Sequence, residues 1–248
     1  MKWSPVLLCL VGFALAGPLK SFVDLQDTKE PHPGEFGDYF EGDIVLPRSR
    51  TGQLAPTYRW PNNTLVYAFA PSINETQRVL VNNTLRLISD GSCLRFVNRT
   101  TEKDYVLVVN NKTGCFSSVG RQRGVQILHL ENDGCFKQGT IAHEFLHALG
   151  FWHAQSAYNR DDYVTINWEN IKKGKEHNFS IKPNTTTTMF DLPYDYGSVM
   201  HYPGTAFSKN GNFTIVPKEE GVEIGQRRGL SGLDFQRLNR MYNCTTGQ

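Results

Sequence analysis

The 248-residue chain has no long apolar run, no internal repeat and no large excess of one charge. Its N-terminal apolar stretch, Val6 to Leu15, is too short to span a bilayer comfortably, and no later segment is apolar enough. The formal charge is only +2, and basic and acidic residues are mixed along the chain rather than forming a basic stripe. We therefore expect neither a membrane span nor nucleic acid as a partner.

The N-terminus has the layout of a secretory signal peptide. Lys2 precedes the apolar stretch, and Ala14-Leu15-Ala16 supplies the small residues of a cleavage site. Residues 1–16 are therefore interpreted as a signal peptide cut after Ala16, and the mature protein is expected to be secreted and extracellular. With 39% hydrophobic residues, the remainder can bury a folded core.

Cysteine and asparagine usage agrees with export. Of five cysteines, Cys9 leaves with the signal peptide, and the even set Cys93, Cys115, Cys135 and Cys244 remains. Four cysteines predict two disulfides in one of three pairings, which sequence arithmetic does not separate. Nine N-x-S/T sequons suit a secreted glycoprotein: Asn62, Asn74, Asn82, Asn98, Asn111, Asn178, Asn184, Asn212 and Asn243.

Residues 17–50 are rich in Pro, Gly and charge, which makes them a poor core sequence. They end at Arg48-Ser49-Arg50, a basic site that suits a trypsin-like protease. We interpret residues 17–50 as a pro-segment that an activating protease removes by cutting after Arg50. The catalytic domain would then comprise residues 51–248.

The run from His143 to His153 indicates a zinc peptidase. On a helix, His143 and His147 stand at i and i+4, so both imidazoles leave one face and can hold one ion, with Glu144 beside it. Gly150 is typical of a helix end, after which the chain can return His153 to the same ion. Three neutral nitrogens leave one coordination position open, as in catalytic zinc sites.

The alternative for this run is a core helix with incidental histidines. The short H-E-x-x-H pattern occurs by accident, but the added glycine and third histidine are much more specific. Downstream, Ser198-Val199-Met200-His201-Tyr202 supplies the Met-turn that follows the long form of the motif. Two separate segments therefore indicate the same zinc site.

Apolar periodicity predicts an α+β fold. The first half reads as strand, helix, three strands and the zinc helix, and this order favours a sheet backed by helices. The second half is rich in Gly, Asn and Pro, with an amphipathic helix near Trp168 to Phe179 and a last helix capped by Ser231 and Asp234. We expect one domain of two lobes, with the zinc helix between them. The expected elements of the first half are strands at 64–69, 94–97, 105–109 and 125–130 and helices at 74–89 and about 137–149.

Several motifs together resemble the astacin family of metzincin zinc endopeptidases. The extended zinc motif and the Met-turn are joined by Asn159-Arg160-Asp161-Asp162-Tyr163-Val164, Arg95-Phe96-Val97, Gly225-Gln226-Arg227 and Tyr242-Asn243-Cys244. The resemblance covers about Phe40 to Cys244. It implies a zincin fold with a twisted, mostly parallel sheet and two long helices in the N-terminal lobe, and a largely irregular C-terminal lobe with a C-terminal helix.

The resemblance also implies a role for each matching residue. It makes His143, His147 and His153 the ligands of one Zn²⁺, Glu144 the general base, and Tyr202 a switchable extra ligand that also stabilises the oxyanion. It selects the disulfides Cys93–Cys244 and Cys115–Cys135.

In the same family, Phe40-Glu41-Gly42-Asp43 resembles the inhibitory motif of the pro-segment. Asp43 would then occupy the metal position that water needs, as a ligand in the zymogen only. Without the family, a Gly-Asp pair is most often a turn. Counting back from Trp60 by similarity places the mature N-terminus at Thr51, directly after Arg50.

The resemblance implies protein or peptide substrates. The strand from Gly124 to Leu130 would offer an edge to which an extended peptide adds by main-chain pairing. Arg227 lies where several relatives carry a basic residue that favours an acidic side chain just after the cleaved bond. The alternative for Arg227 is a surface arginine beside Arg228.

One departure from the family pattern keeps other functions open. Most relatives have Glu after the third histidine, where it pairs with the new N-terminus, but this chain has Ala154. A catalytically weak binding protein with a structural zinc is therefore the main alternative, and a zinc hydrolase acting on something other than peptide is a second. The chain ends four residues after Cys244, and we expect a minimal, monomeric protease without accessory modules.

Overall fold

The computed structural model describes residues 37–46 and 56–245. The expected signal peptide, the Arg50 cleavage site and the Thr51 N-terminus lie outside the described residues. No helix in the described part of the chain is long and apolar enough to cross a membrane.

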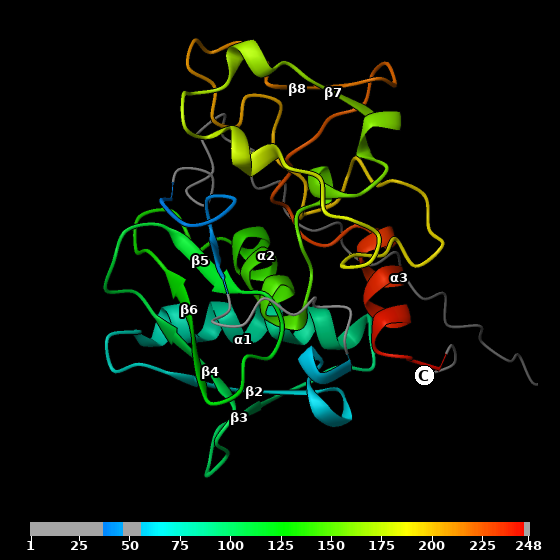
Figure 1. The fold of residues 1–248 in the computed structure, drawn as a ribbon. Coiled ribbons are helices and arrows are strands. Elements are labelled where there is room, and N and C mark those ends of the chain that lie inside the picture. Colours follow the sequence, from blue (N-terminus) through cyan, green and yellow to red (C-terminus); the bar gives the residue numbers. More distant parts are fainter. Residues whose placement is uncertain (1–36, 47–55, 246–248) are drawn as a thin grey trace, which may run out of the picture.

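A six-stranded, mostly parallel sheet forms the lower lobe in Figure 1. Its strands lie in the order β1-β5-β6-β4-β2-β3. The pairs β1–β5, β6–β4, β4–β2 and β2–β3 are parallel, and only β5 and β6 run antiparallel. The strands are β1 Ile44–Val45, β2 Thr64–Phe69, β3 Arg95–Asn98, β4 Tyr105–Val109, β5 Cys115–Ser118 and β6 Val125–Leu130.

Two long helices pack against each other and against this sheet, as expected. Helix α1 (Glu75–Asp90) begins at a capping box in which Asn74 and Gln77 exchange hydrogen bonds. Helix α2 (Gln138–Leu149) is buried along almost its whole length. The core between these layers contains Leu65, Leu85, Ile88, Val106, Leu128 and Phe145.

The expected edge strand is not at an edge. The β6 strand lies between β5 and β4, with residues 125–129 paired to β4 and residues 128–130 paired to β5. The outer position belongs to β5, a short strand that the sequence analysis missed, and β1 of the segment 37–46 pairs with it. A disulfide, Cys115–Cys135, ties the start of β5 to the loop before α2. Main-chain pairing of a peptide would therefore involve β5 rather than β6.

The C-terminal lobe is largely irregular, as expected, and lies above the sheet in Figure 1. Strands β7 (Val164–Ile166) and β8 (Ile215–Pro217) form an antiparallel pair. Helix α3 (Gly232–Met241) begins at the expected capping box of Ser231 and Asp234. The described short 3-10 helices are Pro56–Tyr58, Pro61–Asn63, Ala154–Ser156, Arg160–Asp162, Trp168–Asn170 and Glu176–Phe179.

The prediction of one amphipathic helix near Trp168 to Phe179 is wrong. Two 3-10 turns occupy this stretch, and Gly174 lies between them with a left-handed φ of 85°. The Lys172 amide donates to the carbonyl of Phe207, so the backbone pairs with a distant segment at the point where a helix would continue. Tertiary pairing thus overrides the local apolar spacing.

Two disulfides close the domain, with the pairing that the family resemblance implies. Cys93–Cys244 joins the loop after α1 to the end of the chain, and Cys115–Cys135 links β5 to the loop before α2. Eight of the nine sequon asparagines are exposed, whereas Asn178 is fully buried. A glycan on Asn178 would therefore not fit the folded domain.

Candidate metal centre

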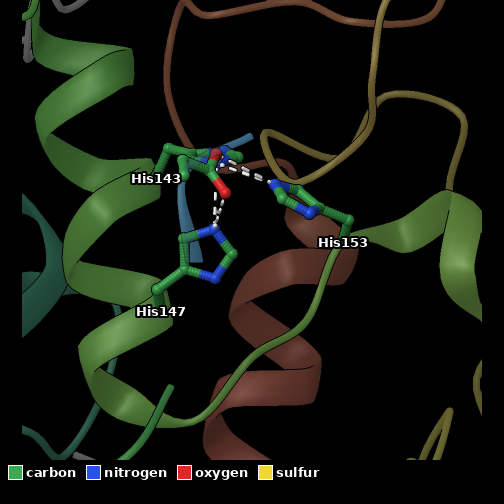
Figure 2. A group of neighbouring side chains, drawn as sticks. His143, His147 and His153 are labelled. Carbon is green, nitrogen blue, oxygen red and sulfur yellow. Dashed lines mark hydrogen bonds and ion pairs between the residues drawn. The ribbon is translucent and has the colours of Figure 1, made fainter. Parts of the chain in front are cut away.

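Helix α2 and the loop after it bring three imidazoles together (Figure 2). His143 and His147 leave the same face of the helix one turn apart. The helix ends at Gly150, whose φ of 115° is left-handed and is tolerated because glycine has no side chain. The chain then turns back, and His153 faces the other two rings.

The hydrogen bonds fix which nitrogen of each ring faces the centre. A carbonyl or carboxylate oxygen can only accept, so each Nδ1 carries a hydrogen and each Nε2 carries the lone pair in the neutral ring. In the neutral rings, the three Nε2 lone pairs therefore converge on one point, where a single metal cation could bind all three. The Nδ1 atoms donate from His143 to the Val199 carbonyl at 2.8 Å, from His147 to the Phe151 carbonyl at 2.7 Å and from His153 to Glu41 Oε2 at 2.8 Å.

The spacing of these nitrogens fits zinc. His143 Nε2 lies 3.1 Å from His147 Nε2 and 3.3 Å from His153 Nε2. A tetrahedral zinc with bonds of about 2.0–2.1 Å would separate its nitrogen ligands by about 3.3–3.4 Å. The Asp43 carboxylate completes a buried group of four whose ligand atoms all lie within 4.8 Å of one another.

The buried Asp43 carboxylate contacts the imidazoles of this group. Its Oδ2 is 3.0 Å from His143 Nε2 and 3.1 Å from His153 Nε2. Burial opposes ionisation, but His153 and His147 outweigh it and hold the pKa of Asp43 well below its usual value. Burial likewise opposes protonation of His153, but Asp43 and Glu41 raise its pKa to about 9. The carboxylates of Asp43 and Glu41 thus favour a positive charge at this end of the site.

Glu144 follows His143 in α2 and is fully buried. Among the described residues, neither of its carboxylate oxygens has a hydrogen-bond partner. Burial and the negative charge of Asp43 raise the pKa of Glu144 well above its usual value. A carboxylate in this state is suited to accept a proton.

Glu41 is a site residue that the sequence analysis did not single out. Its carboxylate is fully buried and accepts from His153 Nδ1 at 2.8 Å and from Ser156 Oγ at 3.1 Å. Lys182 Nζ is 2.7 Å from the same carboxylate. The position of Glu41 within the Phe40–Asp43 motif was a signal that could have identified it, whereas Ser156 and Lys182 carry none in the sequence.

The Met-turn, residues 198–202, is bonded to the chain next to His153. The Met200 carbonyl accepts from the Ala154 amide at 2.9 Å, which ties the turn to the residue after His153. Tyr202 is fully buried, with its ring 4.6 Å from that of His153. Its hydroxyl donates a short hydrogen bond to the Glu41 carbonyl. The tyrosine thus faces the same segment that carries Asp43.

Arg227 lies beside the Met-turn rather than in the ligand group. Its guanidinium donates to the His201 carbonyl at 3.0 Å. Its charge nevertheless reaches the centre: it adds to burial in lowering the pKa of His143, and it opposes the rise in the pKa of Glu144. The structure therefore brings Arg227 into electrostatic range of the site.

Comparison with known proteins agrees with this geometry. A family model described as Astacin, a peptidase family, matches residues 53–243. The chain is 39% identical over 214 residues to zinc metalloproteinase nas-7 of Caenorhabditis elegans, a match that covers 86% of this chain and only 56% of nas-7. The chain thus spans little more than half the length of this relative.

A shorter relative aligns over most of its length. High choriolytic enzyme 1 of Oryzias latipes is 39% identical over 213 residues, covering 82% of this chain and 77% of the relative. A solved structure of that protein, a hatching enzyme zinc-protease, matches with a TM-score of 0.71 at 40% identity, over 75% of this chain and 94% of that chain.

Proposed function

The chain belongs to the astacin family of peptidases, and on that premise we propose that it is a secreted zinc-dependent endopeptidase made as an inactive precursor. Its substrates would be extracellular proteins or peptides. The observation that carries this proposal is the convergence of three Nε2 lone pairs beside a buried, unpartnered Glu144. A structural zinc site would have no use for such a carboxylate.

Three histidines and Glu144 divide the chemistry between them. When bound by His143, His147 and His153, zinc would lower the pKa of a water molecule and polarise the scissile carbonyl. Glu144 would take up the proton of the attacking water and deliver it to the leaving nitrogen. Burial raises the pKa of Glu144, and a raised pKa makes a carboxylate a stronger proton acceptor.

Tyr202 would stabilise the negative charge that develops on the carbonyl oxygen of the substrate. In the structure its hydroxyl already donates to a peptide carbonyl, that of Glu41. A substrate carbonyl placed in the same way would receive the same hydrogen bond. We also propose that Tyr202 is a switchable ligand of the metal.

Latency would come from the segment that holds Asp43. The Asp43 carboxylate contacts the inward-facing nitrogens of His143 and His153, so it would hold the position that water needs. We propose that residues 17–50 are a pro-segment, that a trypsin-like protease cuts after Arg50, and that residues 51–248 are the mature enzyme. The family match, which begins at residue 53, supports this boundary.

Arg227 would favour an acidic side chain just after the cleaved bond. Its partial burial and its electrostatic reach into the centre support this role. Its contact with the Met-turn carbonyl of His201 would hold it in place.

The test is a peptide-library cleavage assay on the precursor before and after treatment with trypsin. Treated wild-type protein should cleave, and both a chelator and Glu144→Gln should abolish cleavage. Glu144→Gln is a sharp control because it keeps the three ligands and the shape of the side chain. Enrichment of Asp or Glu after the cleaved bond, lost in Arg227→Gln, would support the specificity assignment.

Absence of cleavage by folded, zinc-loaded protein correctly cut after Arg50 would overturn the proposal. A binding protein with a structural zinc would then be the better interpretation.

A further inference from the structure

A second carboxylate pocket lies behind the metal centre. The fully buried side chain of Glu41 enters it from the segment 37–46 and meets three donors on the catalytic domain. These are the Nδ1–H of His153, the hydroxyl of Ser156 and the ammonium of Lys182, at 2.8, 3.1 and 2.7 Å. Asp43, two residues later, is the carboxylate that faces the metal position. The two acidic side chains therefore fill different sites.

The walls of this pocket belong to the catalytic domain itself. The Lys182 amide donates to the Ser156 carbonyl at 2.8 Å, and the Ser156 amide donates to the His153 carbonyl at 3.1 Å. The three donors are thus connected by main-chain bonds that do not involve the segment. Removal of the segment would take away the occupant and leave the pocket built.

Lys182 is held over aromatic rings as well as by Glu41. Its Nζ lies 4.1 Å from the ring centre of Phe40 and 4.4 Å from that of Trp152. Glu41 and Phe40 both leave with the segment, so two of these three partners are lost. Among the described residues, no other carboxylate forms an ion pair with Lys182.

The chemistry of the pocket selects an anion of carboxylate size. It offers an imidazole N–H, a hydroxyl and an ammonium, and the contacts to the Glu41 carboxylate include no acceptor from the catalytic domain. The neighbouring Ala154 adds no charge of its own that could compete for Lys182. Hydrogen bonds between charged groups are stronger than neutral ones, so Glu would be preferred to Gln.

We propose that His153 Nδ1–H, Ser156 and Lys182 form a carboxylate subsite that holds Glu41 in the precursor and an acidic side chain of the bound peptide in the mature enzyme. The substrate part of this proposal rests on the proposed peptidase function. The subsite is separate from Arg227, which lies beside the Met-turn. A peptide could therefore be selected for acidic side chains at two positions.

The first experiment measures binding without turnover. The zinc-loaded Glu144→Gln protein, cut after Arg50 and freed of its segment, is titrated calorimetrically with a synthetic peptide of residues 38–45. A second peptide carries Gln in place of Glu41. We expect the Gln peptide to bind about tenfold more weakly, and Lys182→Gln to reduce this difference to less than about twofold. Exposed Lys173→Gln, the matched control, should keep the tenfold difference.

An equal loss for the Gln peptide with and without Lys182 would overturn the subsite. Equal binding of the Glu and Gln peptides by the protein with an intact Lys182 would also overturn the subsite. Lys182→Arg should retain most of the preference, because the charge remains, which separates a charge effect from simple loss of packing.

The second experiment asks whether substrates use the pocket. Mature wild-type protein and Lys182→Gln are compared on a peptide library with paired Glu and Gln at each position. We expect one acidic preference to disappear in Lys182→Gln while the one assigned to Arg227 persists. Cleavage with no Lys182-dependent position would overturn the substrate role. If wild-type protein cleaves nothing, the peptidase proposal fails, and the binding experiment still decides the pocket.

Discussion

Helix α2 contributes one buried carboxylate to the metal centre, Glu144, and the segment 37–46 contributes two, Glu41 and Asp43. Glu144 of α2 has no hydrogen-bond partner among the described residues, and its pKa is raised. Asp43 and Glu41 of the segment face imidazoles and an ammonium, and their pKa values are lowered. Among the described residues, the Glu144 carboxylate thus has no hydrogen-bond partner, whereas both oxygens of Glu41 and one oxygen of Asp43 have partners.

This difference separates a group placed for chemistry from groups placed for binding. A buried carboxylate without partners destabilises the fold, and such groups are retained where a reaction needs them. The carboxylates of the segment instead gain from every contact they make. Substitutions in the zinc motif of α2 should therefore remove peptidase activity. Substitutions of the segment's carboxylates should instead let the uncut precursor cleave peptides.

The largest effect is expected from His147→Ala on the α2 side. Loss of one of three nitrogen ligands should reduce bound zinc from one per chain to nearly none, and activity should fall to background. Metal analysis after dialysis measures this directly. Exposed His177→Ala is the matched control and should retain zinc. A zinc-replete His147→Ala protein would contradict the ligand assignment.

On the segment side, Asp43→Asn should activate a precursor that cannot be cut, such as one carrying Arg48→Gln and Arg50→Gln. Removing a charged hydrogen-bonding partner weakens an interaction by roughly 1.5–3 kcal/mol, or about ten- to a hundredfold in occupancy of the site. Peptide cleavage by the intact precursor is the measurement. Asp38→Asn, on the same segment but fully exposed, should stay silent. Equal activity in the two variants would refute the role of Asp43.

A smaller change is expected from Glu41→Gln in the same precursor. Glu41 accepts from the outer nitrogen of His153, and such contacts typically affect metal affinity by about 10–100-fold. Glutamine still offers an acceptor, so we expect the lower end of this range. Competition with a chelator reports zinc affinity, and Asp38→Asn again serves as the control. Unchanged zinc affinity would show that the contact between Glu41 and His153 does not contribute to metal binding.

The smallest effect is expected from Ser156→Ala, which removes one neutral donor to Glu41. A loss of about 0.5–1.5 kcal/mol should weaken binding of the 38–45 peptide by about two- to tenfold. Calorimetry on the mature Glu144→Gln background measures it, with exposed Ser180→Ala as the control. Equal affinity of Ser156→Ala and Ser180→Ala for the peptide would mean that Lys182 and His153 hold Glu41 without the Ser156 hydroxyl.

The sequence predicted the elements whose signals are local. The start of α3 was predicted from the capping pair Ser231/Asp234, and α1 was predicted from its apolar spacing. The i, i+4 spacing of His143 and His147 likewise predicted two ligands on one helix face, and the glycine at 150 predicted the return to His153.

Features that depend on distant partners were not predictable in this way. Strand β5 is only four residues long, and its pairing with β6 and the Cys115–Cys135 bridge stabilise it. The contact between Glu41 and Lys182 joins a segment near the start of the chain to an irregular loop of the C-terminal lobe. No periodicity or spacing encodes such a contact, so the carboxylate pocket emerged only from the structure.

The pairing of β1 with β5 has a consequence for solubility. While Ile44 and Val45 lie along Ser117 and Ser118, the outer side of β5 is covered. Removal of the segment would leave β5 as an open edge, with main-chain groups ready to pair with any extended chain. The edge that would align a peptide would equally pair with a second copy of the chain, so the bound segment 37–46 protects β5 from self-association.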